Sequence, residues 1–143
     1  MSIVRRSAIV PYSASQMYAL VNDVESYPDF VPWCSKSTSN IISPIEKQAS
    51  LHFARGAIKT SFTTKNTLTP DEEIKLELVD GPFKHLSGDW KFIDIDANGS
   101  RVQLDLEFEI SSRMLKLALE SLFSQVCDRL VKSFVQRANQ VYR

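Results

Sequence analysis

The middle of the chain alternates between apolar and polar side chains, and this alternation predicts β-strands. In residues 102–110 every second residue is Val, Leu, Phe or Ile, and the residues between them are polar or acidic. Similar one-sided runs divide residues 35–110 into six predicted strands, and residues 3–10 form a further strand near the start of the chain. Such alternation is typical of an antiparallel sheet with one apolar face and one face in water.

A helical pattern follows the first predicted strand. Ser13 is placed to cap a helix, and Gln16 completes a capping-box pattern three residues later. Apolar residues in 17–24 then have the spacing of one buried helix face. Pro28 and Pro32 bracket a short segment rich in aromatic residues. Because neither proline fits inside a long helix, we expect a compact helical or turn segment there.

The C-terminal part of the chain predicts one long helix. No Gly or Pro occurs after Ser112, and either Ser111 or Ser112 is the expected N-cap of about 30 helical residues, which would span roughly 45 Å. Apolar residues recur along it at helical spacing, so one face must be buried, and the inner face of the sheet is the available partner. The predicted fold class is therefore α+β. It has a strand, two helical segments, six strands and a long helix, with a curved antiparallel sheet wrapped around that helix.

Residues 79–92 are the most informative stretch of the chain. They contain two of its four glycine residues. Gly81 precedes a proline in a predicted turn, and Gly88 shares a strand face with Trp90. We predict that Gly88 leaves part of this face empty, so that the stretch forms the wall of an apolar cleft. A third glycine, Gly56, is predicted to mark a β-bulge.

The composition narrows the range of functions. Lys and Arg number 17, and Asp and Glu also number 17, so the overall charge does not favour nucleic acid as a partner. Cys34 and Cys127 form no C-x-x-C pair and are expected to be buried, reduced thiols. No apolar run approaches the length of a transmembrane helix, and a cytoplasmic location is expected.

Groups suited to catalysis are sparse. His52 and His85 lie on separate predicted strands without the spacing of a metal site, and we interpret both as ordinary polar strand residues. Asp105, Glu107 and Glu109 occupy the polar face of one strand, which favours a solvated face over an acid–base pair. The sequence predicts no metal site, no cofactor and no enzymatic activity, although a cyclase that acts by shaping its substrate stays open.

Two longer motifs resemble a known family. Residues 21–34, Val-Asn-Asp-Val-Glu-Ser-Tyr-Pro-Asp-Phe-Val-Pro-Trp-Cys, resemble the N-terminal signature of the coenzyme Q-binding branch of START-like proteins. Residues 79–84, Val-Asp-Gly-Pro-Phe-Lys, together with Gly88 and Trp90, resemble its second signature. The resemblance extends over nearly the whole chain. It implies the helix-grip fold of polyketide cyclase-type proteins, as a single domain of residues 1–143.

The resemblance implies two different functions. Mitochondrial members of the family resemble quinone-binding chaperones needed for respiration. Bacterial members include the ribosome association toxin, which binds the large ribosomal subunit and blocks its joining to the small one. Because the chain shows no transit-like segment, it is similar to the bacterial members. A cyclase-like activity is a third alternative.

We predict that the cleft binds a hydrophobic ligand without catalysis, and the resemblance implies ubiquinone or another polyprenyl quinone, held as a ligand and not as a redox cofactor. A pocket of about 300–1,000 Å³ is expected. Thr64 and Asn66 share a strand face with Phe62 and are candidates for hydrogen bonds to the headgroup. The predicted ligand-binding residues are Phe30, Val31, Trp33, Phe62, Thr64, Asn66, Phe83, Leu86, Gly88, Trp90, Leu119, Leu122, Phe123 and Val126.

The ribosome hypothesis relies on a different surface. Residues 111–143 contain an excess of Lys and Arg over Asp and Glu, and a solvated helix face would explain the same charges. The candidate ribosome-facing residues are Lys84, Arg129, Lys132 and Arg137, whose contact with RNA phosphates would weaken as salt is raised. The sequence leaves open the oligomeric state and whether the protein touches a membrane while it loads its ligand.

Overall fold

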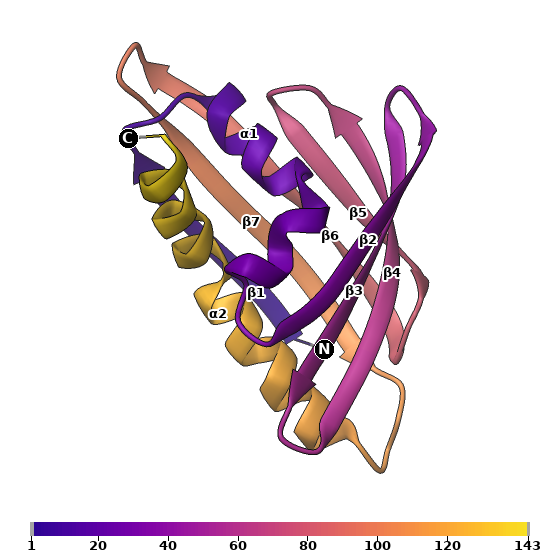
Figure 1. The fold of residues 1–143 in the computed structure, drawn as a ribbon. Coiled ribbons are helices and arrows are strands. Elements are labelled where there is room, and N and C mark those ends of the chain that lie inside the picture. The colour runs from indigo at the N-terminus through magenta and orange to yellow at the C-terminus, as the bar shows by residue number, and fades with distance from the viewer. Residues whose placement is uncertain (1, 143) are drawn as a thin grey trace.

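The computed structural model describes residues 2–142 and contains a curved, seven-stranded antiparallel sheet with helices on its concave side (Figure 1). The strand order is β1-β7-β6-β5-β4-β3-β2, so the first two strands of the chain form the two edges of the sheet. The predicted α+β class and the order of elements are confirmed. The elements are β1 (Ser2–Val10), α1 (Ala14–Asn22), the short 3-10 helix η1 (Val24–Asp29), β2 (Cys34–Ser43), β3 (Glu46–Arg55), β4 (Ile58–Thr69), β5 (Glu73–Asp80), β6 (Phe83–Asp96), β7 (Gly99–Ile110) and α2 (Lys116–Val141).

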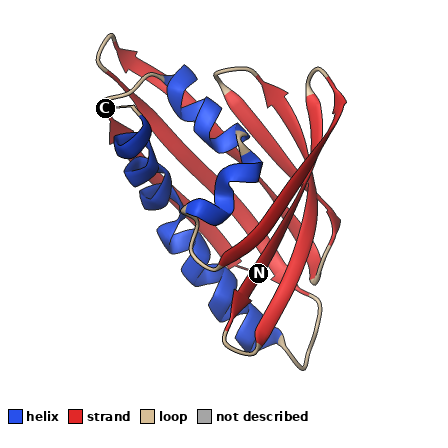
Figure 2. Ribbon diagram, viewed as in Figure 1, coloured by secondary structure: helices blue, strands red, loops and turns tan. Residues whose placement is uncertain are grey.

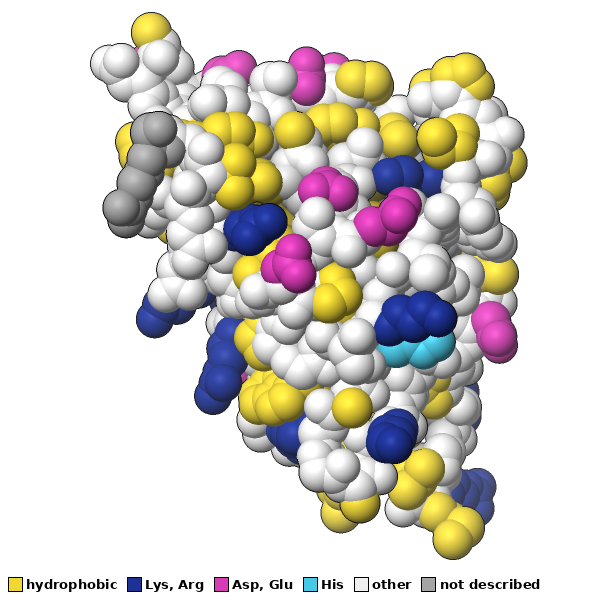
Figure 3. Space-filling model, in the orientation of Figure 1, with side chains coloured by type: hydrophobic (Ala, Val, Ile, Leu, Met, Phe, Trp, Pro, Cys, Tyr) yellow, Lys and Arg dark blue, Asp and Glu magenta, His cyan; other side chains and the backbone are white. Residues whose placement is uncertain are grey.

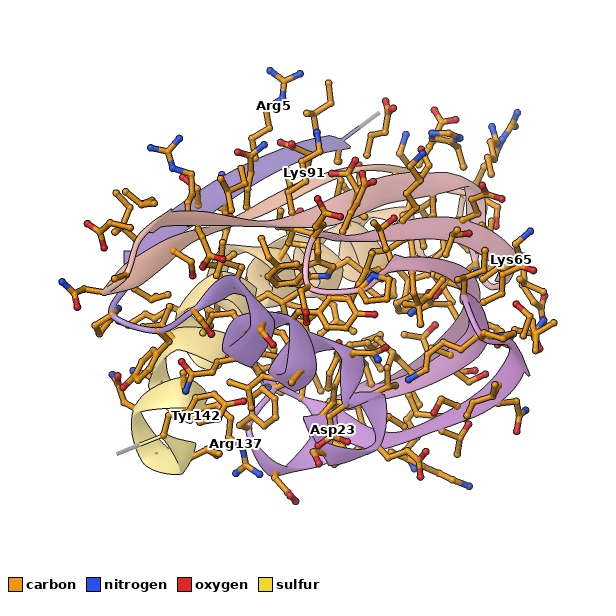
Figure 4. All side chains as sticks on the ribbon, turned by 90° about the horizontal axis from the view of Figure 1, so that it is seen from above. Arg5, Asp23, Lys65, Lys91, Arg137 and Tyr142 are labelled. Atoms are coloured by element: carbon orange, nitrogen blue, oxygen red, sulfur yellow. The ribbon has the colours of Figure 1, made fainter. Side chains whose placement is uncertain are left out.

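The helix α2 lies along the concave face and packs against β1, β7 and α1, as Figure 2 shows. Leu122 and Phe134 on its inner side are fully buried, and so is Phe108 of β7. Polar residues of the sheet point the other way. Arg5 on β1 and Lys91 on β6 project away from the helices in Figure 4. One apolar face of the sheet and one apolar face of α2 therefore form the core, as the two periodicities predict.

The two helix starts differ in how well the sequence predicts them. At α1 the capping box is present, because the Gln16 N–H donates to Ser13 Oγ (3.1 Å) and the Ser13 N–H donates to Gln16 Oε1 (2.9 Å). At α2 the predicted N-cap is wrong, since the helix begins at Lys116 after a turn over residues 113–115. Ser112 Oγ does accept the Leu115 N–H (3.2 Å), but it caps this turn and not the helix itself.

Two glycines have roles that the sequence does not predict. Gly56 is not a bulge: it has φ of +60° in the two-residue turn between β3 and β4, where Arg55 pairs with Ile58. Gly88 does not leave empty wall area. A Cβ atom there would lie 2.2 Å from the carbonyl oxygen of Asp105 on β7 and 2.9 Å from a methyl group of Leu106. Gly88 therefore permits a close approach of β6 to β7.

Replacing Gly88 by alanine is expected to destabilise the protein by about 2 kcal/mol or more, because the added methyl group overlaps the β7 backbone, which cannot move without breaking its strand pairing. Gly56→Ala is the matched control. Its Cβ meets no atom within 4 Å, and only the positive φ opposes it, at a cost of about 1 kcal/mol. Urea unfolding monitored by circular dichroism measures both values. Equal stability losses in the two variants would contradict the close approach.

Candidate ligand cavity

An apolar cavity of about 100 Å³ lies between the concave face of the sheet, η1 and α2. Both signature regions contribute to it, since Val31 follows η1 and Phe83, Leu86 and Trp90 lie on β6. Its wall consists of Val24, Tyr27, Val31, Ala49, Leu51, Phe53, Phe62, Thr64, Asn66, Leu76, Phe83, Leu86, Trp90, Leu104, Leu106, Phe108, Phe123, Val126, Cys127 and Leu130.

Phenylalanine rings pack together on one part of the cavity wall. Phe123 of α2 lies 4.9 Å from Phe83, 5.7 Å from Phe62 and 6.0 Å from Phe53, measured between ring centroids. The rings of Phe53 and Phe62 stack on neighbouring strands. We call these four residues the phenylalanine cluster. Their rings meet mainly edge to face, which is a favoured geometry for aromatic pairs.

Thr64 and Asn66 form the polar part of the wall. Both are 6% exposed, and they lie two residues apart on the inner face of β4. Thr64 Oγ1 donates a hydrogen bond to Asn66 Oδ1 (2.7 Å). Within residues 2–142 the Asn66 side-chain NH₂ has no hydrogen-bond partner, so the wall offers donor N–H groups to whatever enters the cavity.

Two other polar groups of the wall are already engaged or neutral. The Tyr27 hydroxyl donates to the carbonyl oxygen of Val21, which fixes η1 against α1, and burial raises the pKa of Tyr27 far above its usual range. Burial also raises the pKa of the Cys127 thiol to about 12. Cys34, just beyond the cavity, has its pKa raised to about 11 by burial. The expectation of buried cysteines is confirmed.

The predicted ligand-binding residues divide into two groups. Nine of the fourteen line the cavity, and packing explains three of the other five. Leu119 and Leu122 are buried on the inner face of α2, and Gly88 lies at the close approach to β7. Phe30 and Trp33 lie outside the cavity. Leu104 and Phe108 also line the cavity, although they are not among the predicted ligand-binding residues. The alternation of apolar residues along their strand would have been enough to identify them. The cavity is also smaller than the predicted 300–1,000 Å³.

Trp33 and Phe30 instead make cation–π contacts with arginine side chains. The guanidinium carbons of Arg55 (β3) and Arg129 (α2) lie 5.3 and 5.0 Å from the Trp33 ring centroid. Trp33 has φ of +60°, which is unusual for a bulky side chain, and its carbonyl oxygen accepts the Ala54 N–H (3.0 Å). We call Trp33, Arg55 and Arg129 the tryptophan clamp. It joins the segment after η1 to β3 and to α2.

The predicted ribosome-facing residues do not form one cluster around this clamp. Arg137 lies over the Phe30 ring at 5.1 Å, with Asp29 3.9 Å away. Lys132 is exposed on α2, and Lys84 is exposed near the start of β6. By contrast, Arg55 and Arg129 have no carboxylate oxygen within 4.0 Å among residues 2–142. Arg55 was not predicted, because sequence alone does not bring β3 next to α2.

The carboxylate and histidine side chains considered as catalytic candidates lie away from the cavity. Asp105, Glu107 and Glu109 are on the outer face of β7, opposite the side that lines the cavity. His85 Nε2 is 3.1 Å from Ser87 Oγ and 3.9 Å from a Glu107 oxygen on the same outer face. In the part of the chain that the structure describes, no three His, Cys, Asp or Glu side chains are grouped as a metal site, and no helix is long and apolar enough to cross a membrane.

A curved sheet that grips one long helix around an apolar cavity defines the helix-grip class of proteins. An aromatase/cyclase from Streptomyces has the same fold, with a TM-score of 0.86 at 18% identity over 99% of this chain and 96% of that one. The model of the family described as "Polyketide cyclase / dehydrase and lipid transport" matches residues 10–135. The chain belongs to this family.

The curated relatives of this chain include bacterial toxins and a coenzyme Q-binding protein. "Ribosome association toxin RatA" of Vibrio cholerae is 46% identical over 99% of this chain and 99% of its own length. The mitochondrial coenzyme Q-binding protein of Drosophila melanogaster is 26% identical over 94% of this chain and 57% of its own length. The likeness to the two branches that the sequence motifs resemble is thereby confirmed.

Alkylation of the two cysteines tests how tightly the cavity is closed. Because burial raises the pKa of Cys127 to about 12, iodoacetamide at pH 8 is expected to label it at least about a hundredfold more slowly in the native protein than in guanidinium chloride. Peptide mass spectrometry gives the rate at each site, and Cys34 provides an internal comparison. Native labelling of Cys127 at the unfolded rate would mean that water reaches the cavity freely.

Proposed function

We propose that this protein binds a hydrophobic ligand in the cavity without catalysing a reaction, and that the ligand is ubiquinone or another polyprenyl quinone. The observation that carries the proposal is one polar edge with free donors, Thr64 and Asn66, on a wall that is otherwise mainly apolar. The free Asn66 N–H groups match a carbonyl oxygen of a quinone ring, and the apolar wall matches the ring and the first part of its tail.

The size of the cavity supports a site that opens for its ligand. An apolar cavity of about 150 Å³ accommodates benzene, so a substituted quinone ring requires the phenylalanine cluster to move. Burial of about ten methylene-sized groups contributes roughly 8 kcal/mol before the costs of association, which corresponds to reversible binding. A long polyprenyl tail would extend out of the protein. Such carriage needs no acid–base group, in agreement with the position of the carboxylates on the outer face.

Replacing the polar edge with apolar residues of similar shape is expected to weaken quinone binding about tenfold, since one hydrogen bond to the headgroup is lost. The variant Thr64→Val/Asn66→Leu changes both partners, so no buried polar atom is left unpaired. Binding of a ubiquinone with a short isoprenoid tail is measured from quenching of tryptophan fluorescence, because Trp90 lines the cavity.

The control is Ser50→Ala/Thr63→Val, which removes a side-chain hydrogen bond of equal length (2.7 Å) on the outer face of the sheet, between β3 and β4. It is expected to leave quinone affinity unchanged. The proposal is contradicted if the unaltered protein binds no quinone on titration and if organic extracts of the purified protein contain none.

A second candidate function, ribosome association in the cytoplasm, is favoured by a different observation. The relative from Vibrio cholerae carries that name and aligns with nearly the whole chain. The tryptophan clamp supports the same function, because a guanidinium group that lies over an indole can still donate from its N–H edge to phosphate oxygens. Of the two arginines, Arg55 donates from Nη2 to Ser121, so Arg129 is the better candidate for such a contact. Under this hypothesis the protein binds the large ribosomal subunit and keeps it from joining the small one. The clamp and the cavity are separate sites, so the two functions are compatible.

Overproduction of the protein is expected to lower the ratio of assembled ribosomes to free subunits in sucrose gradients, and Arg129→Glu is expected to restore it at least in part. The control Arg101→Glu makes the same charge change at an exposed position on the outer face of β7. Association measured with purified large subunits should weaken as salt is raised. An unchanged ratio on overproduction of the unaltered protein excludes this function.

A further inference from the structure

We propose that one end of the molecule docks on the surface of an anionic lipid bilayer, and that the cavity exchanges its ligand with the membrane there. We call this end the basic pole and define it by the β3–β4 turn (residues 55–59), the β5–β6 turn (81–84) and the β7–α2 loop (111–117). The proposal deepens the hydrophobic-ligand function and rests on it for the exchange step.

The three segments of the basic pole lie together in the fold. Phe83 at the start of β6 pairs with Ile110 at the end of β7, and the Ser111 N–H donates to the Pro82 carbonyl oxygen (2.9 Å). On the other side, Arg55 donates from Nη2 to Ser121 Oγ on α2 (3.3 Å). The β3–β4 turn and the β5–β6 turn therefore flank the start of α2.

Large apolar side chains project from this end into solvent. Met114 is 96% exposed and Leu117 is 85% exposed, and Leu115 between them is about half exposed. They precede or begin α2 and take no part in its buried face. Large apolar groups gathered on a surface and rimmed by polar residues mark an interaction site.

The charged residues within the three segments have one sign. The three segments of the basic pole contain five cationic residues and no Asp or Glu; the cations are Arg55, Lys59, Lys84, Arg113 and Lys116. The nearest acidic residues along the chain, Asp80 and Glu109, lie in the strands behind the turns. In Figure 3 the lower end of the molecule displays apolar, Lys and Arg side chains without Asp or Glu.

The opposite end has the reverse charge. The turns and strand ends at residues 43–46, 70–73 and 94–98 contain six acidic residues and no Lys or Arg; these are Glu46, Asp71, Glu72, Glu73, Asp94 and Asp96. Exposed Ile41 and Ile42 also lie near this acidic pole. A protein with no net charge is therefore a dipole, and an anionic surface attracts only the basic pole.

The basic pole also lies next to the phenylalanine cluster. Phe53 is two residues before Arg55, and Phe83 lies within the β5–β6 segment itself. Phe123 is within two turns of the start of α2. These rings therefore line the cavity on the side of the molecule that bears Met114 and Leu117. A ligand that leaves between them passes directly into whatever the basic pole contacts.

A lipid bilayer fits this surface better than RNA does. Cations attract both partners, but RNA offers nothing to exposed Met and Leu side chains, whereas the boundary between headgroups and acyl chains accommodates them. The proposed occupant is therefore an anionic bilayer, in which Met114 and Leu117 insert while Arg113 and Lys116 contact lipid phosphates.

Flotation with vesicles tests the docking surface. The unaltered protein is expected to bind vesicles of phosphatidylcholine and phosphatidylglycerol mixed two to one, and to bind pure phosphatidylcholine vesicles at least about tenfold more weakly. Met114→Ser/Leu117→Ser and Arg113→Gln/Lys116→Gln are each expected to reduce binding to the anionic vesicles by about tenfold or more.

Matched controls come from the acidic half of the molecule. Ile41→Ser/Ile42→Ser removes two exposed apolar side chains, and Lys75→Gln/Arg101→Gln removes two exposed cations. Both controls are expected to bind vesicles like the unaltered protein. The proposal is overturned if the unaltered protein does not bind anionic vesicles, if a control loses as much binding as its counterpart, or if the protein binds a structured RNA and an excess of vesicles fails to compete.

A quinone titration without vesicles separates this proposal from the ligand-binding function. The variant Met114→Ser/Leu117→Ser is expected to bind short-tailed ubiquinone with unchanged affinity and to release it to anionic vesicles at least about tenfold more slowly. Quinone binding without vesicle binding means that the docking proposal alone has failed. Vesicle binding without quinone binding means that docking stands and the ligand has been wrongly assigned.

Discussion

The structure depends on the burial of a wide, curved apolar sheet face by a single long helix. Seven strands present more inner surface than α2 covers, because the helix packs on β1 and β7 at one side of the sheet. The remaining surface faces α1, η1 and the cavity. The cavity is thus a consequence of geometry. Where the curved sheet diverges from the helix, the space between them has to be filled by side chains or by a ligand. Tyr27 of the first signature motif and Phe83 and Trp90 of the second meet this need.

The cavity wall combines a broad apolar part with one fixed chemical feature. The phenylalanine cluster contributes an apolar surface without polar atoms, whereas Thr64 and Asn66 hold each other in place by a hydrogen bond. Under the proposed function, the apolar wall would accept the ring and tail of the ligand, and Asn66 would orient its one polar group. The same fold in an aromatase/cyclase shows that the scaffold itself does not decide between binding and catalysis. What favours binding in this chain is the position of its carboxylates and histidines away from the cavity.

The positive and negative charges are separated between the two ends of the molecule. Because the net charge is zero, any electrostatic role must come from separation of the two signs, and the fold achieves it by collecting cationic turns at one end and acidic turns at the other. Arg55 belongs both to the basic pole and to the tryptophan clamp, so the two proposed surfaces meet at the start of α2. A bilayer and a ribosome would therefore compete for part of the same side of the molecule.

Local pattern in the sequence determined the strands, the capping box at Ser13 and the apolar face of α2, since each depends on residues only a few positions apart. It also determined that Phe62, Thr64 and Asn66 share a face. Pairing between distant segments was decided only by the tertiary structure. Gly88 meets the β7 backbone, Trp33 receives one arginine from β3 and another from α2, and three separate turns combine into one basic pole. The size of the cavity belongs to this second group, because it is what remains after side chains from different strands and helices have packed.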